Sequence, residues 1–323
     1  MKDKIVDIRD LHVWYRTFSG QVKVLNGVNL NVIRGEKVGI VGETGCGKTT
    51  TVKSILKILA KQASIPKGEI FFNGTDVLKK NKNELKQLHG SGASMIFQDP
   101  TMSLNPVFTI GSQMFAVIKY SGQPGAEKKS VQQALAIKAL KETSMPDPER
   151  ILQSYPFQLS GGMRQRISIA MSLATPRDLV IADEPTTNLD VTIQDQVLKM
   201  LKQRVEDKGS SLILITHSLG VARETTDRIY VMYAGSMVET AFTNELFKKQ
   251  LHPYTQALMD CIPRLSGGGV SEGIPGRIPN YLNPSAGCRF APRCPKAFER
   301  CQTEKPEYVD VGTEHQVACF LYS

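Results

Sequence analysis

Alternating apolar and polar positions mark the first part of the chain. Val28, Leu30 and Val32 alternate with polar residues, which is the pattern of a half-buried strand. An apolar run at residues 70–72 is closed by Asn73-Gly74, a dipeptide that favours a hairpin turn. The N-terminal part is therefore predicted to contain antiparallel β-structure.

A second pattern combines short, mainly apolar runs with helical spacing. Runs at 37–41, 179–182 and 211–216 are long enough for buried strands. Helical spacing follows the first run at Val52, Ile55, Leu56 and Leu59, and the second at Ile193, Val197 and Leu201. The alternation of strand and helix predicts a largely parallel sheet covered by helices.

Two stretches depart from this alternation. From about residue 99 to 171 strand signals are absent and prolines are frequent, so we expect a helical subdomain there. After about residue 265 a Ser-Gly-Gly-Gly segment precedes a tail rich in Pro and Cys. We therefore predict a domain over 1–265 and a C-terminal extension over 266–323.

Composition narrows the class of protein. The chain has 323 residues, 41% of them hydrophobic and 22% charged, as expected for a globular protein and not for a fibre or a disordered chain. No apolar run approaches the roughly 18–20 residues that span a bilayer, and the charged N-terminus does not resemble a secretory signal. We expect a cytoplasmic protein that can sit against a membrane. The net charge of +9 favours polyanions without choosing among them.

The strand at 37–41 leads into a phosphate-binding motif. Residues 42–49, GETGCGKT, match G-x-x-x-x-G-K-[ST] between a predicted strand and a predicted helix. Glycines let successive N–H groups converge on phosphate oxygens, and the helix N-terminus favours the same anion. Lys48 is expected to reach the β- and γ-phosphates, and the Thr49 hydroxyl is expected to ligate Mg²⁺.

Two carboxylates follow the strand at 179–182. The carboxyl ends of parallel strands are where ligands bind in open α/β sheets. We therefore expect Asp183 to hold Mg²⁺ and Glu184 to orient or deprotonate the attacking water. His217 follows the strand at 211–216 and is a candidate for contact with the γ-phosphate.

A second anion site is predicted at Leu159-Ser160-Gly161-Gly162-Met163, which opens a run with helical spacing. A helix N-terminus with a hydroxyl and bare backbone attracts anions. One nucleotide needs only one phosphate-binding site, so a second such site in the same chain requires an explanation.

These motifs together resemble the ATPase subunits of ABC transporters. Residues 159–163 resemble the signature LSGGQ, Gln98 the Q-loop glutamine, 188–190 the D-loop and His217 the switch histidine. The resemblance implies two ATPase subunits packed head to tail, so that Ser160 and Gly162 serve the ATP of the partner. Met163 and Asn188 depart from the usual Gln and Ala, and neither change is expected to abolish hydrolysis.

The resemblance completes the predicted fold and site. The fold is expected to be α/β, with a RecA-like P-loop NTPase core, an antiparallel β subdomain, a helical subdomain and a small cysteine-rich extension. An aromatic residue should stack on adenine, with Tyr15 preferred and Trp14 as the alternative. The predicted nucleotide-binding residues are Tyr15, Gly42, Glu43, Thr44, Gly45, Cys46, Gly47, Lys48, Thr49, Thr50, Gln98, Ser160, Gly161, Gly162 and Asp183. The predicted catalytic residues are Lys48, Gln98, Glu184 and His217, and the predicted Mg²⁺ ligands are Thr49, Gln98 and Asp183.

Three further segments resemble the dipeptide/oligopeptide permease branch. They are the FQDP and SLNP motifs at 97–106, the segment HPYT at 252–255 and the cysteine-rich tail. This implies an ATP-hydrolysing subunit that drives peptide import from the cytoplasmic face of the membrane. Its expected partners are a second ATPase subunit, as a homodimer or a heterodimer, two membrane permease subunits and, indirectly, a substrate-binding protein, with no nucleic acid. A nickel importer and a soluble ABC ATPase remain alternatives.

Four of the six cysteines lie in the tail, at Cys288, Cys294, Cys301 and Cys319. A cytoplasmic location disfavours disulfides. Four thiolates suit zinc or an iron–sulfur cluster, and the wide spacing lacks the paired knuckles of zinc ribbons. We therefore expect a structural [4Fe–4S] cluster, with Zn²⁺ or free thiols as alternatives.

Overall fold

The computed structural model describes residues 3–187, 189–262, 273–312 and 314–323. The chain divides into two compact units. Unit 1 comprises residues 1–5, 33–35 and 79–215, and unit 2 comprises residues 6–32, 36–78 and 216–323. Each unit is described separately below.

The predicted antiparallel structure in the N-terminal part is confirmed as a four-stranded sheet with the order β2-β1-β4-β5. Its strands are β1 (Lys4–Thr17), β2 (Gly20–Ile33), β4 (Ala63–Phe72) and β5 (Thr75–Asp76). Asn73 and Gly74 both have positive φ, 48° and 73°, and join β4 to β5. This is the backbone that a two-residue hairpin turn requires, which explains the Asn-Gly dipeptide.

The remaining strands of unit 2 lie in a sheet with the P-loop strand, β3. β3 (Lys37–Val41) pairs in parallel with β9 (Arg228–Tyr233), and β9 pairs antiparallel with β10 (Ser236–Phe242). Two short strands of the C-terminal tail continue this sheet, β12 (His315–Val317) beside β10 and then β11 (Val309–Gly312). The helices of this unit outside the tail are α1 (Lys48–Ile55), α9 (Leu219–Thr225), α10 (Thr243–Lys248) and α11 (Pro253–Asp260).

Unit 1 contains a parallel sheet and a helical block. β6 (Ala93–Ile96), β7 (Leu179–Asp183) and β8 (Ser211–Thr216) pair in parallel in the order β8-β7-β6. The long helix α8 (Val191–Asp207) connects β7 to β8, which confirms the predicted strand and helix alternation. A short helix, α2 (Lys82–Gln87), precedes β6.

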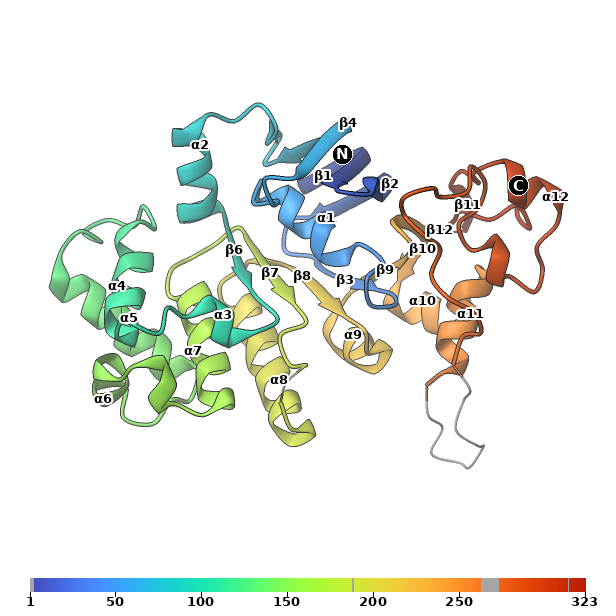
Figure 1. Cartoon of the computed structure of the whole chain (residues 1–323). Helices are drawn as coiled ribbons and strands as arrows, with labels where there is room; N and C mark the ends of the chain where they lie inside the picture. Colours follow the sequence, from blue (N-terminus) through green and yellow to red (C-terminus); the bar gives the residue numbers. More distant parts are fainter. Residues whose placement is uncertain (1–2, 188, 263–272, 313) are drawn as a thin grey trace. The chain divides into compact units, whose positions relative to one another are not determined.

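The predicted helical subdomain forms the block seen in green in Figure 1. It contains α3 (Pro100–Ser103), α4 (Ile110–Lys119), α5 (Lys129–Glu142), α6 (Pro148–Gln153) and α7 (Gly161–Leu173). Ile110, Met114, Ile118, Leu140 and Ile167 are fully buried in a core of its own. This core gives the signature helix α7 a rigid support.

The described part of the C-terminal extension is packed into unit 2. It contains a 3₁₀ turn at Ala291–Arg293 and the short helix α12 (Glu299–Thr303). Phe290 is 1% exposed, and its ring lies 5.0 Å from that of Tyr233 and 5.3 Å from that of Tyr254. The extension is thus held by apolar packing and by the pairing of β12 with β10. The predicted boundary at 265/266 lies outside the described residues and stays a prediction.

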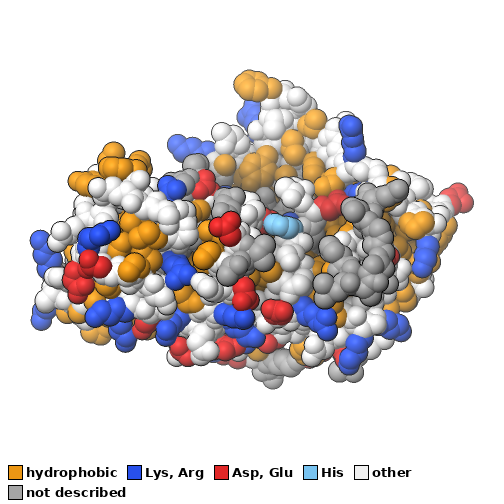
Figure 2. All heavy atoms as spheres, turned by 90° about the horizontal axis from the view of Figure 1, so that it is seen from below, with side chains coloured by type: hydrophobic (Ala, Val, Ile, Leu, Met, Phe, Trp, Pro, Cys, Tyr) orange, Lys and Arg blue, Asp and Glu red, His pale blue; other side chains and the backbone are white. Residues whose placement is uncertain are grey.

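Two surface properties bear on the expected partners. In the part of the chain that the structure describes, no helix is both long and apolar enough to cross a bilayer. On the face drawn in Figure 2, Lys and Arg side chains lie interspersed with acidic ones, so the excess positive charge is spread over that face.

Candidate nucleotide site

The loop between β3 and α1 adopts a conformation that its glycines make possible. Gly42, Gly45 and Gly47 all have positive φ, at 151°, 82° and 108°. A Cβ atom on Gly42 would lie 2.1 Å from the carbonyl oxygen of Met232, so only glycine fits there. Gly47 is the N-cap of α1 and has no side chain to cap it, so backbone N–H groups remain directed at the space in front of the helix.

Lys48, the first residue of α1, is buried within this loop. Its ammonium donates to the carbonyl oxygens of Gly42 at 2.7 Å and Glu43 at 3.1 Å. The side chain therefore bridges the start and the end of the loop. A phosphate placed at the N-terminus of α1 would meet both this cation and the loop N–H groups.

We expect Lys48→Ala to weaken both nucleotide binding and hydrolysis. The substitution removes the cation and leaves two loop carbonyls without their donor. Loss of a well-placed donor to transition-state charge costs about a hundredfold in rate. Affinity is measured by titration with a fluorescent ATP analogue, and turnover by phosphate release.

The matched control for this prediction is Lys53→Ala, which removes a lysine from the last turn of the same helix. Equal losses in the two variants would contradict a specific role for Lys48.

The carboxyl end of β7 holds the two predicted carboxylates. Asp183 is buried as the last residue of the strand, and Glu184 leaves it with a φ of 45°. The Glu184 carboxylate accepts hydrogen bonds from Gln98 Nε2 at 3.1 Å and Thr187 Oγ1 at 3.0 Å. The structure thus brings together Gln98, Asp183 and Glu184, three of the predicted site residues, within unit 1. These hydrogen bonds orient the Glu184 carboxylate, the candidate general base.

The other predicted site residues of unit 2 are His217, Tyr15 and Trp14, and fewer contacts define their roles. His217 follows β8 and its side chain is exposed. Tyr15 and Trp14 are both half-buried in β1, and the Lys23 ammonium lies 5.3 Å from the centre of the Trp14 ring. The choice of Tyr15, with Trp14 as the alternative, as the residue that stacks on adenine stays a prediction.

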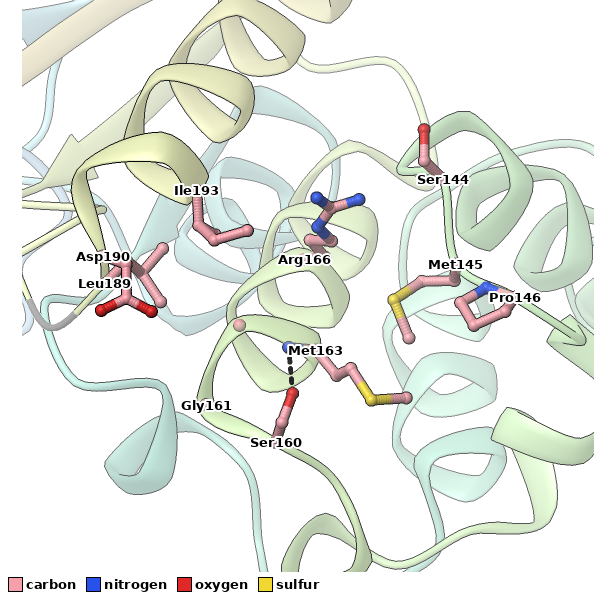
Figure 3. Close-up of a pocket in the computed structure, with 11 residues that line it drawn as sticks. Ser144, Met145, Pro146, Ser160, Gly161, Met163, Arg166, Leu189, Asp190 and Ile193 are labelled. Atoms are coloured by element: carbon pink, nitrogen blue, oxygen red, sulfur yellow. Dashed lines mark hydrogen bonds between the residues drawn. The ribbon is translucent and has the colours of Figure 1, made fainter.

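The signature residues line a pocket of about 480 Å³ in unit 1, shown in Figure 3. Ser160 is the N-cap of α7 and accepts a hydrogen bond from Met163 N at 3.3 Å. Its own hydroxyl hydrogen remains to be donated. Leu189 and Asp190 from the D-loop line the same pocket, and Asn188 lies outside the described residues. The second predicted anion site therefore lies at a pocket in the structure.

The cysteine prediction requires correction. Cys288, Cys294, Cys301 and Cys319 do line one cavity, but its volume is about 20 Å³, which is room for about one water molecule. Among the described residues, no three Cys, His, Asp or Glu side chains are arranged to hold a metal ion. Burial raises the pKa of Cys288 to about 11. The predicted [4Fe–4S] cluster is therefore wrong, and the Zn²⁺ alternative has no support in the described part of the chain.

The P-loop, the acidic strand end and the α/β fold define a P-loop nucleoside triphosphatase. Residues 25–187 match the family described as "ABC transporter", and residues 238–301 match "Oligopeptide/dipeptide transporter, C-terminal region". The chain belongs to the ATP-binding subunits of ABC transporters, a family of ATPases, and has the C-terminal region of the oligopeptide/dipeptide transporter group.

Relatives extend over almost the whole chain. It is 42% identical over 321 residues to "Probable peptide ABC transporter ATP-binding protein y4tR" of Sinorhizobium fredii, covering 98% of this chain and 95% of that protein. It is 40% identical over 322 residues to "Dipeptide transport ATP-binding protein DppD" of Bacillus subtilis, covering 99% and 95%. Neither name mentions a metal cluster.

Solved structures agree with the fold. The "Dimeric Structure of MJ0796, a Bacterial ABC Transporter Cassette" matches with a TM-score of 0.66 at 26% identity, over 74% of this chain and 98% of that one. A post-hydrolysis form of the same cassette with ADP and phosphate matches with a TM-score of 0.64 at 25% identity.

Three residues that contact the P-loop were missed by the sequence analysis. Tyr254 accepts a hydrogen bond from Glu43 N at 2.9 Å, Tyr281 donates to Gly45 O at 2.9 Å, and Arg293 forms an ion pair with Glu43. The sequence marks the segment at 252–255 only as typical of the peptide branch. No local pattern links residues more than 200 positions apart in the sequence, so only the fold reveals these contacts.

Proposed function

We propose that this chain is the ATP-hydrolysing subunit of an importer for dipeptides or oligopeptides. The main support is the combination, in one chain, of a full ATPase motif set with the C-terminal region of peptide transporters. Relatives named for dipeptide and oligopeptide transport cover nearly the whole chain.

The residues divide the work as follows. Backbone N–H groups at the N-terminus of α1 and the Lys48 ammonium bind the phosphates, and Tyr15 stacks on the base. Thr49, Gln98 and Asp183 are the residues that would hold Mg²⁺, and the ion would supply positive charge against the phosphates. Glu184, oriented by Gln98 and Thr187, takes a proton from the attacking water, and His217 senses the γ-phosphate.

Two such subunits work as a pair. The matched cassette structures are titled as dimeric, which supports a head-to-tail pair in which the Ser160 pocket faces the partner's ATP. We propose that the pair docks on two membrane permease subunits at the cytoplasmic face of the membrane. ATP binding would then close the pair, and hydrolysis and release would open it, and these motions would move the permease subunits.

Transport itself is tested by co-purifying the chain with its membrane subunits and reconstituting the complex in vesicles. We expect ATP-dependent uptake of labelled di- and oligopeptides that stops with Glu184→Gln. Uptake of Ni²⁺ without peptide uptake would overturn the proposed substrate and leave the ATPase assignment intact.

A further inference from the structure

An ion pair joins the C-terminal extension to the P-loop within unit 2. The Arg293 guanidinium contacts both oxygens of Glu43, Nη1 to Oε2 at 2.7 Å and Nη2 to Oε1 at 3.0 Å. The Arg293 side chain is only 5% exposed, and that of Glu43 is 24% exposed. The bond to Glu43 raises the pKa of Arg293 above its ordinary value, so the pair stays charged. A bidentate, poorly solvated pair of this kind has a defined geometry.

Arg293 also fixes its own surroundings. Its Nε donates to Pro275 O at 2.7 Å, Nη2 to Ile274 O at 2.8 Å and Nη1 to Tyr233 Oη at 3.3 Å. With the two bonds to Glu43, each of the N–H donors of the guanidinium has a partner. A lysine could not make this set of contacts. The residue therefore joins the extension, β9 and the P-loop in one network.

A second contact comes from Tyr281. Its hydroxyl donates to Gly45 O at 2.9 Å, in the middle of the P-loop. The Arg289 guanidinium lies 5.6 Å from the centre of the Tyr281 ring and also donates to Ala234 O. The next residue, Gly235, donates its N–H to Cys46 O at 2.7 Å. The extension thus supports the loop directly and through the turn between β9 and β10.

The negative charge of Glu43 makes these contacts relevant to nucleotide binding. A carboxylate at the second position of a loop that binds a triphosphate repels the ligand, because both are negative and lie within the screening length of physiological salt. Arg293 neutralises this carboxylate and holds it on the side of the extension. Tyr281 holds the carbonyl of Gly45, which orients the neighbouring peptide groups.

We propose that Arg293 and Tyr281 are positioning residues for ATP binding, through which the C-terminal extension sets the affinity of the P-loop. The inference rests on the proposed nucleotide site and goes beyond it, because it gives the extension a role in binding. It requires neither a peptide substrate nor the membrane subunits.

The test measures binding of a fluorescent ATP analogue to the purified full chain. Arg293→Ala leaves the Glu43 carboxylate without its ion-pair partner. We expect the affinity for the ATP analogue to fall about five- to tenfold, which is the size of a partly screened charge repulsion. Adding Glu43→Gln to Arg293→Ala should restore affinity to within about twofold of Glu43→Gln alone, since the repelling charge is gone. A purely structural role for Arg293 would show no such rescue and would overturn the charge argument.

A second variant covers the case in which Arg293→Ala fails to fold. Tyr281→Phe keeps the ring beside Arg289 and removes only the hydroxyl, and we expect about a threefold loss of affinity, as for one neutral hydrogen bond. The control is Tyr322→Phe, whose hydroxyl donates to Leu251 O at 3.0 Å. Wild-type affinity in Tyr281→Phe would overturn the role of Tyr281. If the wild-type chain itself binds no ATP, the nucleotide site and not this inference has failed.

Discussion

Replacing Glu184 by glutamine is expected to give a protein that binds ATP and barely hydrolyses it. The amide keeps the size of the carboxylate but cannot accept the proton of the attacking water. The expected loss is about a hundredfold or more in turnover, the scale observed when one transition-state group is removed. Binding should stay close to that of the wild type, because the P-loop of unit 2 supplies the phosphate contacts.

The measurement pairs steady-state phosphate release with titration of a fluorescent nucleotide. Glu149→Gln, on the exposed surface of α6, is the matched control in the same unit and should behave as the wild type. Thr187→Val removes the hydroxyl that donates to the Glu184 carboxylate and should give an intermediate rate. Wild-type turnover in Glu184→Gln would show that another group acts as the base.

The parts of the fold that local chemistry dictates were predictable from the sequence. Val38, Ile40 and Val41 are buried in β3, as expected for a short apolar run that precedes a glycine-rich loop and forms a covered strand. The Asn73-Gly74 dipeptide predicts the hairpin turn that it forms between β4 and β5. The order of the ATPase motifs also specified the family, which the comparisons confirm.

The parts that depend on long-range packing were not predictable. The cysteines were interpreted as ligands because their spacing could be counted, but the packing around Phe290 leaves their cavity too small for a cluster. The bond between Arg293 and Glu43 joins residues 250 positions apart, and neither residue has a local signal. Packing of the extension against β9 and β10 produces both the small cysteine cavity and the Arg293–Glu43 bond. Sequence periodicity contains no information on this packing.

The strongest test of the paired arrangement is Gly162→Asp. We expect this variant to bind ATP at its own P-loop with unchanged affinity and to lose hydrolysis by about a hundredfold or more, because a carboxylate would face the partner's γ-phosphate. A Cβ atom on Gly162 would lie 3.7 Å from Ile193, an ordinary van der Waals contact, so the backbone accepts a side chain at this position. An acidic residue in the first turn of α7 also suits the helix dipole, so folding should not suffer.

Two controls separate charge from size and from residue identity. Gly162→Ala adds the same Cβ without the carboxylate and should retain most of the activity, whereas Met163→Gln installs the usual signature residue and should not lower it. In mixtures of Gly162→Asp with Lys48→Ala subunits, each mixed pair has one intact composite site if the two phosphate-binding sites act across the pair. Recovery of hydrolysis on mixing, as a function of subunit ratio, then measures that arrangement directly. Full hydrolysis by Gly162→Asp alone, at concentrations where the chain is monomeric, would contradict it, because a site complete within one subunit does not need the signature pocket of another.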